Sequence, residues 1–239
     1  MTICKSLGGA AALTLALAGL HTQAQAQSQD YTVRVGYSNI APNSSASDAT
    51  GPFLFKPTSG VSLEVKNEST LFFSVARKID DRFEVELALG LPPTHDVTAK
   101  LNPSIVPSHV VSAYQGQTIA RIRQLAPTVF LNYSFGDSSS ALRPFVGLGL
   151  NYTRFDERRS TPTGNSLNGG PTDIRLSDSW GLAAQVGLDY RINDKWSIHG
   201  SVATARVKTT LTATTAGAAR VMDINFHPVV LTVAAGYRF

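Results

Sequence analysis

The sequence predicts an all-β protein: one eight-stranded antiparallel β-barrel that spans a bacterial outer membrane, with short periplasmic turns and long extracellular loops. Three observations support this prediction. A secretory signal precedes the domain, eight later stretches carry an apolar residue at every second position, and the gaps between them are long and short in turn. All three are typical of outer-membrane barrels, whose strands alternate lipid-facing and lumen-facing side chains.

The first 26 residues differ from the rest of the chain. Lys5 is their only charged residue, an apolar run rich in Ala and Leu covers residues 7–20, and Ala24-Gln25-Ala26 has the form of a signal-peptide cleavage site. This pattern predicts a cleaved signal peptide over residues 1–26 and a single barrel domain over residues 27–239. The apolar run is too short for a spanning helix. Cys4, the single cysteine, would leave with the signal.

Charge and hydropathy exclude some classes of protein. Without Lys5 the basic residues fall from 21 to 20 against 17 acidic ones, so the formal charge falls from +4 to +3. No basic cluster accompanies this small excess, which argues against a nucleic-acid partner. The mean hydropathy is −0.01, as expected where lipid-facing and lumen-facing residues cancel.

The two-residue period defines the predicted strands. In residues 82–91, for example, Val85 and Leu87 share one face while Glu86 lies on the other. Such alternation is typical of strands with two different environments on their two faces. The eight predicted strands cover residues 31–40, 70–78, 82–91, 127–135, 143–155, 179–192, 195–211 and 228–239.

The two faces of these strands favour a membrane barrel over a soluble β-sandwich, although alternation alone leaves the sandwich open. The polar face is mostly Gly, Ala, Ser, Thr and Asn, which suits a narrow barrel interior, whereas a solvated face would be richer in Lys and Glu. Aromatic residues near the strand ends fit interfacial belts: Tyr31, Phe83, Tyr133, Phe135, Tyr152, Tyr190, Trp196, Tyr237 and Phe239.

The gaps between the strands set the topology. Three are short, at residues 79–81, 136–142 and 193–194, and four are long, at residues 41–69, 92–126, 156–178 and 212–227. Short turns on one rim and long loops on the other place both termini in the periplasm. An even strand number also allows closure, which removes unpaired strand edges from the lipid.

Six stretches of the chain resemble the OmpW family of small outer-membrane barrels. They are residues 33–42, 83–96, 125–137, 143–156, 176–193 and 229–239. The most specific is RPFVGLGLNYTRF followed by DSWGLAAQVGLDY, whereas the terminal GYRF is typical of outer-membrane barrels in general. The resemblance covers nearly the whole mature chain in the right order.

The resemblance implies a role in the passage of small hydrophobic molecules, which enter from outside and leave sideways through the barrel wall. Members of the family can place large apolar side chains on the inner faces of the third and seventh strands. The matching residues here are Ala88 and Ala203, which puts a constriction at that level in doubt and makes both residues candidates for the lining of the lumen. The gap at 92–126 is also long for the family.

Charged residues gather on the predicted inner face near the short-turn rim. Opposite charges in a narrow barrel should pair, because isolated ions out of water are costly. The cluster either closes the periplasmic end as a polar plug, forcing apolar cargo out through the wall, or only fills and stabilises the barrel. Its members are Arg34, Lys78, Glu84, Glu86, Arg143, Asp189, Arg191 and Arg238.

The first long gap holds three adjacent apolar residues, Phe53, Leu54 and Phe55, between Pro52 and Pro57. Such a run is unusual in exposed sequence. It could line a ligand entrance, or it could pack beneath other loops or touch the outer leaflet.

The search for catalytic groups predicts that the chain is not an enzyme. No nucleophile motif frames the four histidines of the mature chain, His95, His109, His199 and His227, and three of them lie in or beside predicted loops. No paired histidine spacing suggests zinc. We therefore expect no cofactor and no metal.

The sequence favours a binding and transport barrel for small hydrophobic solutes. The expected partners are these solutes, outer-membrane lipid with lipopolysaccharide, and the barrel assembly machinery, which would read the C-terminal strand that ends at Phe239. The alternative is a structural or host-interaction barrel that acts through its extracellular loops and carries nothing in its lumen.

Overall fold

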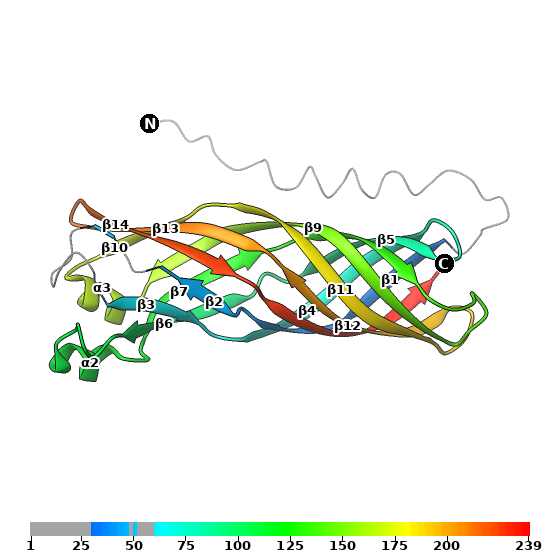
Figure 1. Ribbon diagram of the computed structural model, residues 1–239, viewed down its shortest axis with the longest axis horizontal. Helices are drawn as coiled ribbons and strands as arrows, with labels where there is room; N and C mark the ends of the chain where they lie inside the picture. The colour runs from blue at the N-terminus through cyan, green and yellow to red at the C-terminus, as the bar shows by residue number, and fades with distance from the viewer. Residues whose placement is uncertain (1–29, 48–49, 52–59) are drawn as a thin grey trace, which may run out of the picture.

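A computed structural model describes residues 30–47, 50–51 and 60–239 of the chain. The predicted signal peptide and the apolar run of Phe53, Leu54 and Phe55 lie outside the described residues. The molecule is an elongated barrel of tilted strands (Figure 1). One end, here called proximal, holds Tyr31 and Phe239, and the opposite, distal end holds two short helices.

Eight strands close the barrel, which confirms the predicted fold class. Each pairs antiparallel with two neighbours in the order β1-β4-β5-β8-β9-β11-β12-β15, and β15 returns to β1. Short turns at 79–82, 135–141 and 192–195 connect them at the proximal end. The strands are β1 (Tyr31–Ala41), β4 (Glu68–Lys78), β5 (Phe83–Gly90), β8 (Thr128–Ser134), β9 (Leu142–Ser160), β11 (Ser179–Arg191), β12 (Trp196–Ala205) and β15 (Val229–Arg238).

The predicted alternation holds along these strands. Leu148 of β9 is 75% exposed on the outer surface, whereas its neighbours Gly147 and Gly149 face side chains of the interior. Aromatic pairs form belts on the outside, such as Trp196 against Tyr237 with ring centroids 5.0 Å apart near the proximal end. This surface of apolar strands and terminal aromatic rings is the one that a bilayer requires.

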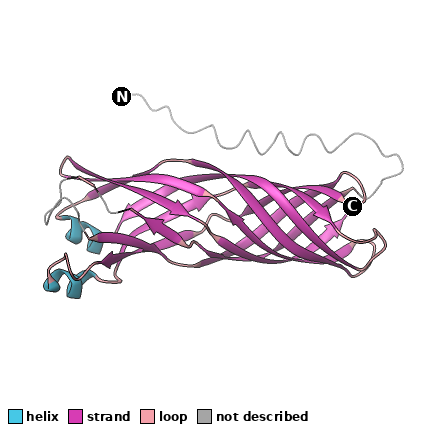
Figure 2. Cartoon of the chain, in the orientation of Figure 1, coloured by secondary structure: helices cyan, strands magenta, loops and turns pink. Residues whose placement is uncertain are grey.

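The four long gaps contain more regular structure than the sequence predicted. Further strands extend through these gaps toward the distal end of the molecule, as Figure 2 shows in magenta. The added elements are β2 (Ser44–Ala46), β3 (Val61–Val65), β6 (Thr94–Leu101), β7 (Thr118–Leu125), β10 (Thr172–Leu176), β13 (Val207–Thr215), β14 (Ala218–Phe226), α2 (Ser108–Tyr114) and α3 (Pro162–Asn168). Within the described residues no helix has the length and apolarity needed to cross a membrane.

The distal strands form two facing sheets instead of a closed ring. One has the order β3-β6-β7-β9 and the other β10-β13-β14-β2. In the described part of the chain, no ladder joins β2 to β3 or β9 to β10. The predicted seventh strand, residues 195–211, is divided into β12 and β13 at Arg206 because the wall passes there from the ring into the second sheet. A buried apolar core between the two sheets explains why these segments are ordered.

Candidate functional site

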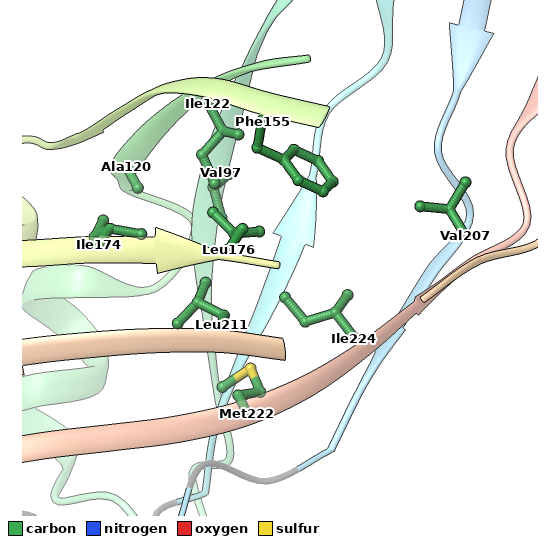
Figure 3. Close-up of a cluster of buried hydrophobic side chains, with 10 residues drawn as sticks. All are labelled: Val97, Ala120, Ile122, Phe155, Ile174, Leu176, Val207, Leu211, Met222 and Ile224. Atoms are coloured by element: carbon green, nitrogen blue, oxygen red, sulfur yellow. The ribbon is translucent and has the colours of Figure 1, made fainter. Parts of the chain in front are cut away.

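An apolar cavity of about 180 Å³ lies where the barrel meets the two distal sheets. Ala88 of β5 and Ala203 of β12 both line it, so the two positions singled out from the sequence lie on the same cavity. Its distal wall is formed by side chains of the core cluster shown in Figure 3. Side chains of both sheets, such as Phe155 and Ile224, point into the space between them. The small side chains of Ala88 and Ala203 leave the proximal part of this cavity open.

Polar side chains also line the cavity, but most of them already bond other groups of the protein. Ser38 and Thr232 share a hydrogen bond of 2.7 Å. Asn151 donates to the hydroxyl of Thr128 at 2.9 Å and accepts from Thr153 at 2.7 Å. Paired polar groups offer little to an incoming ligand, so the cavity surface is effectively apolar at these points.

His95 of β6 is an exception among the lining residues. The ring is only 3% exposed, and its Nδ1 lies 2.9 Å from the carbonyl oxygen of Lys66. Its Nε2 is buried and has no hydrogen-bond partner among the described residues. Burial lowers the pKa of His95 more than the Lys66 carbonyl and the nearby Glu68 raise it. The ring is therefore neutral near pH 7.

Three aromatic rings close the barrel beneath the cavity. Phe72 and Phe130 line its lower part, and the buried ring of Phe145 lies parallel to that of His199 at a centroid distance of 5.2 Å. Inward glycines make room for these rings. A Cβ at Gly149 would lie 2.8 Å from Phe130, and one at Gly187 would lie 2.4 Å from Phe145, closer than atoms pack in protein interiors.

A buried charge cluster lies below this aromatic layer. Arg34 of β1 is at its centre, with Nη2 2.9 Å from Glu84 and Nη1 3.1 Å from Glu86. Its Nη2 also lies 3.6 Å from Asp189, whose other oxygen is 2.8 Å from Nδ1 of His199. The opposite charges predicted to pair across the lumen do pair here.

Amide groups complete the coordination of the buried Glu86 carboxylate. Its Oε2 accepts from Asn132 at 2.9 Å and from Gln185 at 3.0 Å. Because Gln185 also lines the apolar cavity, the polar cluster begins directly under the cavity floor. Both oxygens of the Glu86 carboxylate are thus hydrogen-bonded, which stabilises its charge out of water.

The remaining charges of the predicted cluster lie closer to the proximal end. All eight predicted residues except Glu86 line a small polar cavity of about 80 Å³. Lys78 pairs with Asp81 of the first turn at 2.6 Å, while Arg143 and Arg191 donate to backbone carbonyls of the turns. Arg34 is therefore the main partner of the inward carboxylates, and the other cations, Arg238 among them, border the proximal opening.

The wall of the apolar cavity has few backbone hydrogen bonds around residues 91–93. On the β4 side, Leu91 donates its N–H to the carbonyl of Leu71 and its carbonyl accepts from the hydroxyl of Thr70, and the next backbone bond on this side is from Lys66 to Asp96. On the β8 side, the pair Ala88–Thr128 is followed by a bond from Gln124 to the carbonyl of Pro93. Leu91 lines the cavity and is also 51% exposed, so a thin segment with few backbone hydrogen bonds separates the cavity from the barrel surface.

Sequence reasoning missed several residues of this interior. Phe72, Phe130 and Phe145 all have the inward parity of their strands, as do Gln185 and His199. The signal was therefore present, but the inner face was interpreted mainly as small residues. His95 and Asp96, adjacent in sequence, point to opposite sides of β6, and Asp96 bonds Arg121 outside. They are therefore no catalytic pair.

Comparison with known proteins identifies the barrel. A model of the OmpW family matches residues 27–239. The chain belongs to the OmpW family. Outer membrane protein W of Vibrio cholerae is 32% identical over 100% of this chain and 99% of its own length. The crystal structure of OprG from Pseudomonas aeruginosa superposes with a TM-score of 0.74 at 26% identity, over 88% of this chain and 95% of that chain.

Family membership places the barrel in the outer membrane of Gram-negative bacteria. The proximal turns of this OmpW-family barrel are accordingly periplasmic and the distal sheets extracellular. A further relative is the dibenzothiophene metabolism operon protein PahQ of Pseudomonas aeruginosa, 26% identical over 90% of both chains.

Proposed function

We propose that this OmpW-family barrel passes small apolar molecules across the outer membrane. The observation that carries the proposal is the apolar cavity of about 180 Å³, which is closed on the periplasmic side by aromatic rings and charges and bounded laterally by a thin wall with few backbone hydrogen bonds. A dry apolar cavity of ~150 Å³ is enough to bind benzene. The relative from an operon for dibenzothiophene metabolism, a polycyclic apolar compound, supports cargo of this kind.

The exit of the cargo is sideways into the bilayer. The straight path to the periplasm would lead through Phe145, the buried Glu86 carboxylate and Arg34, each at most 3% exposed. An apolar molecule would lose free energy by replacing that network. The segment 91–93 offers a shorter way out, since few backbone hydrogen bonds hold it to its neighbours.

The entrance includes Phe53, Leu54 and Phe55. These residues lie outside the described part of the chain, so the proposal for them depends on their apolar run in an otherwise polar loop. Replacing Phe53 and Phe55 with Ser should lower uptake of a hydrophobic probe by cells at equal surface abundance of the protein. Unchanged uptake would remove these residues from the path.

Two further partners belong to the proposal. Lipopolysaccharide and the other outer-membrane lipids surround the exposed apolar strands. The barrel assembly machinery engages the C-terminal strand, in which Phe239 donates its backbone N–H to Tyr31 at 3.0 Å and its ring lies parallel to that of Tyr31. Closure of the barrel therefore uses the last residue, and its deletion should lower the amount of assembled protein.

The lumen itself is tested with a pair of tryptophan variants. Ala88→Trp fills the cavity from the inner face, whereas Leu87→Trp places the same side chain on the outer face, where Leu87 is 38% exposed. We expect Ala88→Trp to lower uptake of a hydrophobic probe several-fold and Leu87→Trp to leave it unchanged. Equal uptake by both variants, at equal folded abundance, would favour a structural or host-interaction barrel that acts through its extracellular part.

A further inference from the structure

His95 lies between the apolar cavity and residues 91–93, the part of the wall with few backbone hydrogen bonds. It faces inward from β6, opposite Ile122 in the ladder with β7, and both side chains line the cavity. Its bond to the Lys66 carbonyl lies beside residues 92–95, which make no backbone hydrogen bond to β4 within the described part of the chain. A ligand that occupies the cavity or leaves through the wall passes this ring.

The chemistry of the free ring nitrogen follows from the bond at the other one. A carbonyl oxygen only accepts, so Nδ1 of His95 carries the proton that bonds Lys66. In the neutral ring Nε2 then has a lone pair and no hydrogen. This acceptor is buried and has no partner in the described structure, and such a group costs free energy until a donor reaches it.

We propose that the preferred cargo is a small apolar molecule with one hydrogen-bond donor, a hydroxyl or N–H, that bonds Nε2 of His95. The inference rests on the proposed function and narrows it from apolar molecules in general to this class. The rest of the lining is mainly apolar, and most of its other polar side chains bond within the protein, so it favours an apolar molecule with a single donor. His199 also has an unpartnered Nε2, but it lies below the cavity beside Phe72 and Phe145 and does not line it.

Toluene and p-cresol, which differ by one hydroxyl, provide the test. Binding of each to the purified full-length mature barrel is measured by calorimetry for the wild type and for His95→Phe, which keeps a planar ring and removes the acceptor. We expect the preference for p-cresol over toluene to fall about fivefold in the variant, while toluene binding changes less than twofold. His109→Phe, the same substitution at an exposed histidine of α2 that does not line the cavity, should keep the wild-type preference.

The outcomes separate this inference from the proposed function. An unchanged preference in His95→Phe, or an equal loss in His109→Phe, overturns the assignment of His95 while apolar binding stands. Failure of the wild type to bind either probe overturns both proposals. If His95→Phe does not fold, the ¹⁵N resonance of His95 Nε2 in the wild type decides. It should shift with p-cresol and not with toluene, and equal behaviour with both probes refutes the hydrogen bond.

Discussion

Arg34 shows how one side chain closes the periplasmic half of the barrel. It is 3% exposed and bonds carboxylates that come from β5 and β11. Removing one partner of a buried ion pair is far more damaging than removing the whole pair, because the remaining charge is left out of water. The stability of the floor thus depends on this guanidinium more than on the cations at the rim.

Arg34→Met should lower the free energy of unfolding by about 3–5 kcal/mol, because it strands Glu84, Glu86 and Asp189 without their cation. The measurement is guanidinium-induced unfolding in lipid bilayers. Arg77→Met is the matched control on the outer surface, where Arg77 lies 5.6 Å above the ring of Tyr31 and should be worth about 0.5–1 kcal/mol. Similar losses in both variants would contradict the central role of Arg34.

At the scale of elements, the segment that joins β5 to β6 controls the wall. Pro92 and Pro93 follow Leu91 and lack backbone N–H donors, so this part of the chain cannot complete a ladder with its neighbours. The cavity is lined here by Leu89, Gly90, Leu91 and Pro93. The two prolines therefore leave few backbone hydrogen bonds in this part of the wall, whereas neighbouring strands of the barrel ring, such as β1 and β15, pair along their length.

The double variant Pro92→Val/Pro93→Val restores two N–H donors and a residue type that favours strands. We expect it to reduce uptake of a hydrophobic probe several-fold, since the wall can then pair across the exit. Pro144→Val is the control, because Pro144 lies in β9 near the periplasmic end, away from the cavity. Full uptake by the double variant would place the exit elsewhere.

The whole molecule combines an apolar chamber above with a charged floor below. Ions would have to cross a cavity with an apolar lining and then the ring of Arg34 and its carboxylates. Both barriers are in series, and an eight-stranded barrel has room for little besides its own side chains. The molecule should therefore behave as a binding barrel and not as an aqueous pore.

The reconstituted barrel should accordingly show no steady ionic current in planar bilayers, even while it passes a hydrophobic probe. Single-channel recording checks this expectation. A large ohmic current through folded wild-type protein would contradict the closed floor and would require an open aqueous path beside the charge cluster.

The sequence by itself determined the parts of this protein that depend on local pattern. Lipid on one side of each strand and a narrow lumen on the other impose a two-residue period, so strands such as β5 and β15 and the inward parity of Ala88 and Arg34 could be predicted. The short turns and the even number of strands followed from the spacing of these patterns.

Only the tertiary structure decided what the interior does. Arg34 and Glu86 are 52 residues apart, and no local pattern states which inward charges meet. The distal strands of the long gaps were not predicted, because their apolar faces become buried only when the two sheets pack against each other. His95 is a similar case, because only its inward direction follows from the alternation along β6. The cavity that it lines and the burial of its unpartnered Nε2 depend on the packing of both distal sheets and of the segment with Pro92 and Pro93.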